Sequence, residues 1–404
     1  MTISRMVSLA WRNLVHDRRR LAVSLAGVAF AVVLMAMELG FRFALLDSMV
    51  EVIRLLDTDL VVVSQHKNTL ASSAPFNRRI LQDILMCREV EEACPLYIET
   101  RFSNLRDPQA QPTTSSSRAS RVSSRRPLAR KIRVLAFNPR DHVFLMPEVD
   151  EAIPELASPE TALYDSKSNE AIGTVQPGNT LTLAQRPVRI VGTFRLGADL
   201  VNDGNMIMTD HNFLRYFPDW RQRAPELRSV ELGLIRLTPS SNPEIVRGWL
   251  DKRFQPRGVR VLTRDEFQER EHEFWNARTP IGFIFQVGAV LGLVVGGVIC
   301  YQILSSDIAD HISEYATLKA MGYANVYLVA VVMAEALFLA FLGFVPGLLV
   351  SLALYQVVAI ETGLLMHPTM PRVLAILGLT VLMCLGSGLF AMRKLLSADP
   401  AGLF

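Results

Sequence analysis

Residues 281–304 have the sequence IGFIFQVGAVLGLVVGGVICYQIL, which contains no charged side chain. About twenty consecutive apolar residues are enough for an α-helix to cross the hydrocarbon core of a bilayer. Half of the 404 residues are hydrophobic, and the mean hydropathy of +0.25 is high for a water-soluble protein. This stretch therefore predicts a membrane-spanning helix in an integral membrane protein.

Three further apolar runs predict membrane helices, and each contains at most one charged residue: 21–41, 326–360 and 373–392. The run 326–360 is longer than one span requires but too short for two, so we predict one tilted or kinked helix that contains Pro346. The first run follows three arginines, as the apolar core of a signal peptide does. It is longer than such a core and does not end in a small-residue cleavage site, so we predict a retained helix.

The basic residues near the two chain ends predict the orientation. The first twenty residues carry five arginines against one aspartate, and Arg393 and Lys394 follow the last apolar run. Lys and Arg accumulate in cytoplasmic segments, so we expect both termini in the cytoplasm of a multi-pass protein of the inner (cytoplasmic) membrane. The segment between the second and third helices is more acidic than basic, but acidic residues contribute little to this rule.

The predicted order is a cytoplasmic amphipathic segment (1–20), a first helix (21–46), a large periplasmic domain (47–279), a second helix (280–304), a cytoplasmic segment (305–324), a third helix (325–358), a short periplasmic loop (359–372), a fourth helix (373–392) and a cytoplasmic tail (393–404). The fold class is therefore four membrane helices with one large α+β domain inserted after the first.

A strand–helix–strand pattern occurs at each end of the domain 47–279. The segments are 59–65, 78–90 and 94–105 at its start, and 230–237, 243–254 and 258–262 at its end. Because these units flank a central insert, we predict an α+β subdomain assembled from both ends. The alternating residues 179–197 predict a small β-rich subdomain within the insert. Residues 264–278 have a polar helical pattern, which we expect to continue rigidly into the second membrane helix.

Residues 108–130 are rich in Ser, Arg, Pro and Thr and poor in apolar side chains, which predicts a disordered loop. A solvated insertion explains its arginines more simply than contact with an anionic lipid or wall polymer. Cys87 and Cys94 also lie in this domain, where a disulfide and two unpaired thiols are both consistent with the sequence.

The sequence contains no motif for catalysis or for nucleotide or metal binding. The phosphate loop GxxxxGK[ST], the zinc helix HExxH and the nucleophile elbow GxSxG are all absent. We therefore predict a non-catalytic protein without a cofactor or metal of its own. The net charge of +3 is too small to predict nucleic-acid binding.

Two carboxylates lie within the predicted membrane helices, where ionisable side chains are costly. Glu38 is near the outer end of its run and one helical turn from Arg42, so local pairing is a sufficient explanation. Glu335 is deeper and is a candidate intramembrane polar site. It lacks a second intramembrane acid or base, which favours a bond between helices or a snorkelled position over proton transfer.

The cytoplasmic segment 305–324 has the sequence SSDIADHISEYATLKAMGYA. A short helix is expected to end at Gly322, because glycine is the residue most often found after the last helical turn. Composition alone favours a helical linker along the membrane, and a helix presented to a cytoplasmic partner is the alternative.

Three separated segments resemble a known family. EYATLKAMG at 314–322 resembles the coupling segment of FtsX/MacB-type ABC transporter permeases, and the layout of four helices with one large inserted domain resembles theirs over nearly the whole chain. The segments 9–48 and 190–218 resemble the corresponding parts of DevC-type permeases in particular. The insertion 108–130 has no counterpart in that pattern. The resemblance assigns contact with the ATPase to Glu314, Tyr315, Ala316, Thr317, Leu318, Lys319, Ala320, Met321 and Gly322.

The resemblance implies a permease subunit of an ABC exporter. Such permeases form homodimers, recruit a separate ATPase that binds the ATP, and transmit its motion to their periplasmic domains. A periplasmic membrane-fusion adaptor and an outer-membrane channel complete the machine, and a glycolipid or another amphiphile is the implied cargo. Two alternatives remain, an FtsX-like transducer that regulates a periplasmic hydrolase and a lipoprotein-releasing permease.

Overall fold

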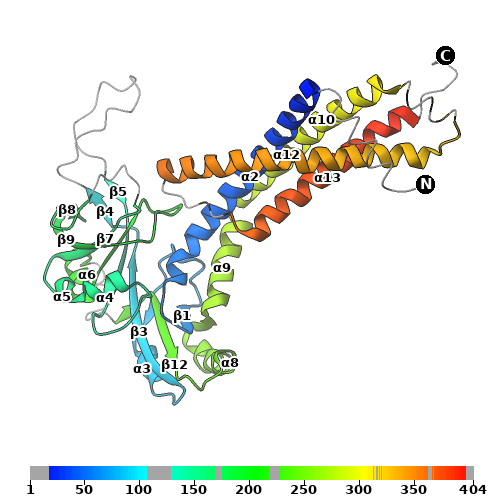
Figure 1. Cartoon of the computed structure of the whole chain (residues 1–404). Helices are drawn as coiled ribbons and strands as arrows, with labels where there is room; N and C mark the ends of the chain where they lie inside the picture. The colour runs from blue at the N-terminus through cyan, green and yellow to red at the C-terminus, as the bar shows by residue number, and fades with distance from the viewer. Residues whose placement is uncertain are drawn as a thin grey trace. The chain divides into compact units, whose positions relative to one another are not determined.

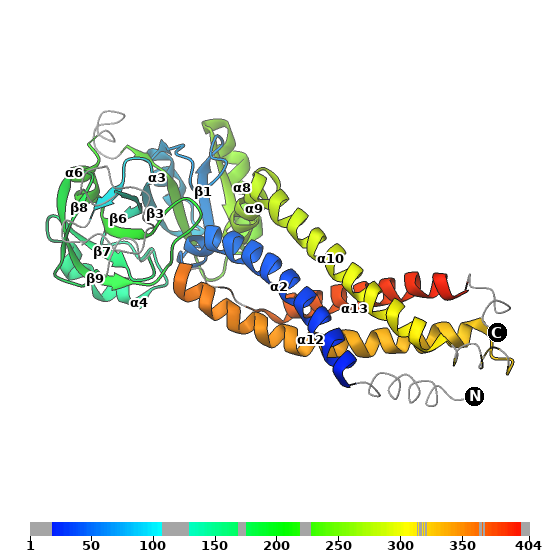
Figure 2. The ribbon, with the colours of Figure 1, turned by 90° about the horizontal axis from the view of Figure 1, so that it is seen from above.

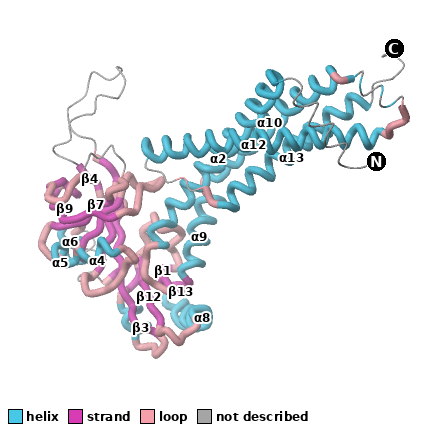
Figure 3. The backbone as a smooth tube through the Cα atoms, viewed as in Figure 1, coloured by secondary structure: helices cyan, strands magenta, loops and turns pink. Residues whose placement is uncertain are grey.

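The computed structural model describes residues 18–106, 129–168, 175–218, 228–312, 314, 317, 319, 321–362, 366 and 368–396. The chain divides into two compact units. We call residues 1–44, 280–359 and 366–404 the helical unit, and residues 45–279 with 360–365 the sheet unit. Figure 3 shows that the strands are confined to the sheet unit.

The described part of the helical unit contains four helices long and apolar enough to cross a membrane (Figure 1). They are α2 (Arg18–Arg54), α10 (Pro280–Asp310), α12 (Asn325–Thr362) and α13 (Met370–Leu396). The predicted four membrane helices are therefore confirmed. The run around Pro346 forms one continuous helix, as expected. Helix α2 extends past the predicted end at residue 46, and its last turns carry ion pairs from Arg54 to Asp47 and Glu51.

Small residues allow the membrane helices to approach closely. A Cβ atom added at Gly343 of α12 would lie 2.6 Å from the Cβ of Val28 in α2. Helices α10 and α13 are joined by the Ser387 hydroxyl, which donates to the carbonyl of Gly297 over 2.8 Å. Without a hydrophobic driving force inside a bilayer, helix association depends on such close packing and on polar contacts between helices.

One part of the sheet unit is an antiparallel sheet with strand order β13-β1-β12-β3. The chain order is β1 (Leu60–Ser64), α3 (Arg79–Leu85), β3 (Val90–Glu99), β12 (Leu232–Leu237), α8 (Pro243–Phe254) and β13 (Val259–Thr263). This is the split β-α-β-β-α-β arrangement of ferredoxin-like folds. The predicted α+β subdomain built from both ends of the region is therefore confirmed.

Both faces of this sheet are covered, which is why β1 (LVVVS) is buried throughout. Leu60 and Val62 pack on the side of α3 and α8, where Ile84 and Leu250 belong to the same core. Val61 and Val63 pack on the opposite side, with residues from the end of α2 and from α9 (Arg264–Ala277), among them Ile53 and Phe267.

The insert forms a barrel-like ring of strands. Its elements are β4 (Asn104–Arg106), β5 (Arg130–Lys131), β6 (Arg133–Phe137), α4 (Pro147–Glu151), α5 (Ile153–Leu156), β7 (Thr161–Asp165), β8 (Thr180–Leu183), β9 (Arg186–Phe194), β10 (Asn205–Thr209) and α6 (Asp210–Tyr216). The sheet order continues β3-β6-β10-β7-β9-β8-β4-β5. Because β4 follows β3 and β5 precedes β6, the ladder returns to the segments where it began. Figure 2 shows β6, β7, β8 and β9 gathered in this part of the sheet unit.

The predicted β-rich subdomain is therefore confirmed, and it is larger than the single stretch 179–197 suggested. The short strands β2 (Phe76–Asn77) and β11 (Ser229–Val230) pair separately, and the 3-10 turn η2 (Gln255–Arg257) joins α8 to β13.

Several expectations need correction. The helix expected over 78–90 ends at Leu85, where Leu85 and Met86 are exposed, so the helix does not continue with a buried face. The stretch 94–105 is interrupted after Glu99, whose carboxylate accepts the backbone N–H groups of the next turn.

The rigid continuation of 264–278 into the membrane is also wrong, since α9 ends at Ala277 and α10 begins at Pro280. The helical backbone conformation is unfavourable for a residue that precedes proline, and Thr279 precedes Pro280, which explains the break between the two helices. Most of the expected loop 108–130 lies outside the described residues, although Arg130 begins β5.

The cysteine alternatives are resolved. Cys87 and Cys94 are both free thiols. Cys87 packs against the core on the α3 side of the sheet, whereas Cys94 belongs to the core on the opposite side. Burial raises the pKa of the Cys94 thiol to about 12, so this thiol stays protonated.

Candidate functional site

The predicted coupling segment is partly described. Its described residues Glu314, Thr317 and Lys319 are helical, and the N–H of Gly322 donates to the Lys319 carbonyl over 3.0 Å. Gly322 has φ +91°, and a Cβ there would meet open space, so the backbone angle is what requires glycine. The expected end of the helix at Gly322 is confirmed. Tyr315, Ala316, Leu318 and Ala320 lie outside the described residues.

The described residues of this segment are accessible. Glu314 and Thr317 are exposed, and Met321 is 63% exposed. Val326, at the start of α12, is 78% exposed. An acidic side chain and apolar side chains on one short connection between two membrane helices suit contact with a protein partner. Their role in coupling remains a prediction.

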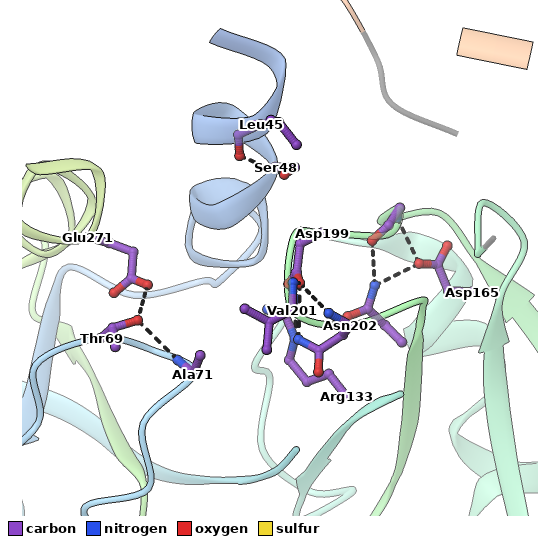
Figure 4. Close-up of polar contacts among 12 residues, drawn as sticks. Leu45, Ser48, Thr69, Ala71, Arg133, Asp165, Asp199, Val201, Asn202 and Glu271 are labelled. Carbon is purple, nitrogen blue, oxygen red and sulfur yellow. Dashed lines mark hydrogen bonds and ion pairs between the residues drawn. The ribbon is translucent and has the colours of Figure 1, made fainter. Parts of the chain in front are cut away.

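A second feature lies in the sheet unit, where α9 holds the segment Gln65–Pro75, which we call the anchored loop. The Glu271 carboxylate of α9 accepts the hydroxyl of Thr69 (2.6 Å) and the N–H of Leu70 (2.8 Å), as well as the indole N–H of Trp275 (2.8 Å). Glu271 is only 1% exposed. Figure 4 shows it facing Thr69. A buried carboxylate with three donors fixes the loop to the helix firmly.

The other side of the anchored loop is fixed to β12 and its flank by a buried ion pair. Lys67 Nζ lies 2.6 Å from Glu231 Oε2, and both side chains are 1% exposed. Glu231 also accepts the Ser73 hydroxyl (2.6 Å), and Lys67 Nζ donates to the Ser72 carbonyl (2.7 Å). Arg270 of α9 donates to the Lys67 carbonyl over 2.6 Å, and burial lowers the pKa of Arg270.

A third polar cluster organises the connection between β9 and β10. Asp165 accepts the N–H of Gly197 (2.7 Å) and the side-chain amide of Asn205 (2.8 Å). Asp199 accepts the N–H of Asn202 (2.8 Å) and pairs with Arg133 (Figure 4). Burial lowers the pKa of Arg133 to about 10. Within the stretch 190–218, the side chains of Asp199 and Asn205 therefore hold the loop between β9 and β10 in place.

The two intramembrane carboxylates differ in burial, because Glu38 is half-buried and Glu335 is fully buried. A Cβ added at Gly288 of α10 would lie 2.5 Å from Glu38 Oε2, so the Glu38 carboxylate lies against α10. Glu335 is 1% exposed within the helical unit, which excludes a snorkelled side chain at its surface. Among the described residues, no three His, Cys, Asp or Glu side chains are arranged to hold a metal ion.

Sequence reasoning did not identify the contacts of Lys67, Glu231 and Glu271. Each occurs singly, and their partners are separated by more than 150 residues along the chain. No local spacing indicates such pairs, because only the folded sheet brings β12 and α9 to the anchored loop.

Comparisons with known proteins place the carboxy-terminal part in a class. Residues 287–400 match the family model described as FtsX-like permease C-terminal. The periplasmic region of MacB from Actinobacillus actinomycetemcomitans is 8% identical, with a TM-score of 0.34, over 53% of this chain and 92% of that chain. The extracellular domain of the noncanonic ABC-type transporter YknZ from Gram-positive bacteria is 10% identical, with a TM-score of 0.31, over 51% of this chain and 98% of that chain. No curated protein matches the chain.

The described chain is thus a multi-pass membrane protein by the length and composition of its helices. Residues 287–400 are similar to the carboxy-terminal domain of FtsX-like permeases.

Proposed function

We propose that this chain is the membrane-spanning permease subunit of an ABC exporter, in which an ATPase bound at the coupling segment moves the sheet unit. The observation that carries the proposal is the position of that segment. It lies inside the FtsX-like permease domain, between α10 and α12, and it exposes Glu314 and Met321. An ATPase contact there would act directly on the ends of two membrane helices.

The chain connection from α10 to the sheet unit supports transmission of this motion. Only Arg278 and Thr279 separate α9 from α10, and the Thr279 hydroxyl donates back to the Trp275 carbonyl over 2.5 Å. A displacement of the first turn of α10 therefore reaches α9 through a very short link. Glu271 of α9 then passes it to the anchored loop, because two hydrogen bonds, from Thr69 and Leu70, hold the loop to that carboxylate.

The finer features of the proposal follow the DevC-type resemblance. Both termini lie in the cytoplasm, the sheet unit lies in the periplasm, and two copies of the chain work together in the inner membrane. A membrane-fusion adaptor and an outer-membrane channel receive a glycolipid or another amphiphile. The cluster of Arg18, Arg19 and Arg20 before the first membrane helix supports the orientation.

Co-purification with the cognate ATPase tests the coupling assignment. The substitution Met321→Arg places a charge on the exposed coupling segment, and Glu314→Arg reverses one. We expect each to reduce the recovered ATPase at least tenfold. Met86→Arg is the matched control, because Met86 is 85% exposed in the sheet unit. Undiminished recovery with Met321→Arg and Glu314→Arg would refute the assignment.

Cysteine labelling in whole cells tests the orientation with the same two positions. In a chain whose native cysteines are replaced, Met86→Cys should react with a membrane-impermeant maleimide added outside an outer-membrane-permeabilised cell. Met321→Cys should react only after the inner membrane is opened. The reverse pattern would overturn the proposed topology.

A further inference from the structure

The sheet unit contains a cavity of about 590 Å³ that none of the features above uses. Its volume lies within the range of small-molecule sites in proteins, roughly 300–1,000 Å³. Its walls come from separate parts of the chain: the end of the anchored loop, the turn after β3 with β4, the β8–β9 hairpin, the residues at the end of α6, and β11.

Two arginines give the cavity a positive charge. Arg101 and Arg106 both line it and are exposed, and neither forms an ion pair with another described residue. The one acidic residue among its described lining is Glu99, and the Glu99 carboxylate accepts the N–H groups of Arg101 (2.6 Å) and Phe102 (3.0 Å). Glu99 therefore fixes the backbone of the turn that contains Arg101, and Arg106 lies at the end of β4. Guanidinium groups bind phosphate, sulfate or carboxylate.

Aromatic side chains supply an apolar wall beside these charges. Phe102 is 49% exposed, and the Arg101 guanidinium lies 5.3 Å from the centre of its ring. Phe217 is buried and also lines the cavity. The hydroxyl of Tyr216 donates to the Pro187 carbonyl over 2.5 Å, so Tyr216 offers the cavity its ring. Burial raises the pKa of Tyr216 to about 12, which keeps this hydroxyl protonated.

The hairpin that forms another wall has an unfavourable backbone. Ala184 and Gln185 join β8 to β9 with φ values of +46° and +68°, and both line the cavity. Two-residue hairpins with positive φ strongly prefer Asn and Gly, because the left-handed conformation is unfavourable for residues with other side chains. Such strain accumulates at functional sites. Three non-glycine residues in the described chain have positive φ, and two of them, Ala184 and Gln185, line this cavity.

We propose that this cavity binds an amphiphile with an anionic headgroup, which contacts Arg101 and Arg106 while its apolar part packs against Phe102 and Phe217. That the bound amphiphile is the cargo rests on the proposed export function, but the binding itself does not. The chemistry combines two requirements, because a free anion would leave the aromatic wall unused and an uncharged lipid would leave both guanidinium groups without a partner.

Photolabelling of the full chain tests the site. The chain is placed in nanodiscs of zwitterionic lipid and exposed to dodecyl phosphate that carries a diazirine in its alkyl chain. Mass spectrometry then locates the crosslinks. We expect them in the peptides that contain Phe102 and Phe217, with labelling at least tenfold weaker in the double variant Arg101→Gln/Arg106→Gln. Phe102→Ala should also weaken labelling, and Arg101→Lys/Arg106→Lys should largely retain it.

The control Arg88→Gln/Arg140→Gln removes the same charge from two exposed arginines outside the cavity and should label like the native chain. Dodecyl glucoside with the same diazirine tests the headgroup, and an excess of inorganic phosphate tests the apolar part. Equal labelling of the native chain and the Gln double variant would overturn the proposal. So would crosslinks confined to the membrane helices, equal labelling by the glucoside, or complete competition by inorganic phosphate.

The outcomes separate this inference from the proposed function. Labelling in the cavity without recovery of any ATPase would leave the site standing and refute the exporter. Recovery of the ATPase without cavity labelling would do the reverse.

Discussion

The buried ion pair of the anchored loop allows the sharpest quantitative prediction. Lys67 and Glu231 are each 1% exposed and lie 2.6 Å apart. The substitution Lys67→Met leaves the Glu231 carboxylate buried with only the Ser73 hydroxyl and the Ala74 N–H as hydrogen-bond donors. Removal of one partner of a buried pair costs about 3–5 kcal/mol of unfolding free energy. For a unit of this size, about 2–4 °C of Tm per kcal/mol gives a fall of roughly 6–20 °C.

The assay is thermal unfolding of the full chain in nanodiscs, followed by tryptophan fluorescence. Trp275 is a suitable reporter because its indole N–H donates to Glu271, which also holds the anchored loop. Lys252→Met is the matched control, since Lys252 is exposed and forms no ion pair with another described residue. It should change the Tm by less than about 2 °C, because surface substitutions usually stay within ±0.5 kcal/mol.

The double variant Lys67→Met/Glu231→Leu completes the test. Replacement of a whole buried ion pair by apolar side chains is often neutral or stabilising by about 1–4 kcal/mol. We therefore expect the double variant to recover most of the stability lost in Lys67→Met. A fall of less than about 2 °C in the single variant, or a further fall in the double variant, would refute the reasoning.

Three further predictions follow from other contacts. Cys300 and Cys384 Sγ atoms lie 3.3 Å apart, so mild oxidation in membranes should join α10 to α13 by a disulfide, detected as loss of two maleimide-reactive thiols; persistence of both thiols would contradict this packing. Glu271→Gln should keep the ATPase bound but lower export at least tenfold, whereas Glu273→Gln on the exposed face of α9 should change neither. Burial raises the pKa of Asp141, so its charged form weakens the fold at neutral pH; Asp141→Asn should raise the Tm at pH 7, and this gain should vanish as the pH falls through the raised folded-state pKa to below about 3.8. A gain independent of pH would contradict the last of these.

The proposed transmission of motion depends on which parts of the sheet unit are joined firmly. Glu271 and the Lys67–Glu231 pair join α9, the anchored loop and the flank of β12 into one body. The same loop ends at Ser73 and Pro75, which line the cavity. A displacement of α9 would therefore change the cavity wall, and this connects the proposed coupling route to the proposed ligand site.

Local sequence patterns are enough to predict the membrane helices and the two halves of the α+β sheet. An uncharged run such as 281–304 has few alternatives to a membrane span, because lipid satisfies no backbone hydrogen bond. The helix 243–254 was predicted with its observed bounds, since Asn242 caps it and Pro243 starts it. Gly322 likewise predicts the end of the helix in the coupling segment, because the positive φ that follows the last turn is a local requirement that glycine meets.

Long-range packing, which no local pattern specifies, brings distant residues together. The closure of the barrel-like ring depends on pairing β4 with both β5 and β8, and no local pattern specifies such partners. Lys67 and Glu231 are single charges 164 residues apart, and burial together makes them an ion pair. The cavity and its arginines arise in the same way, because a concave surface is formed by elements that the chain brings together only after folding. Local physics therefore set the elements, and long-range packing set the sites.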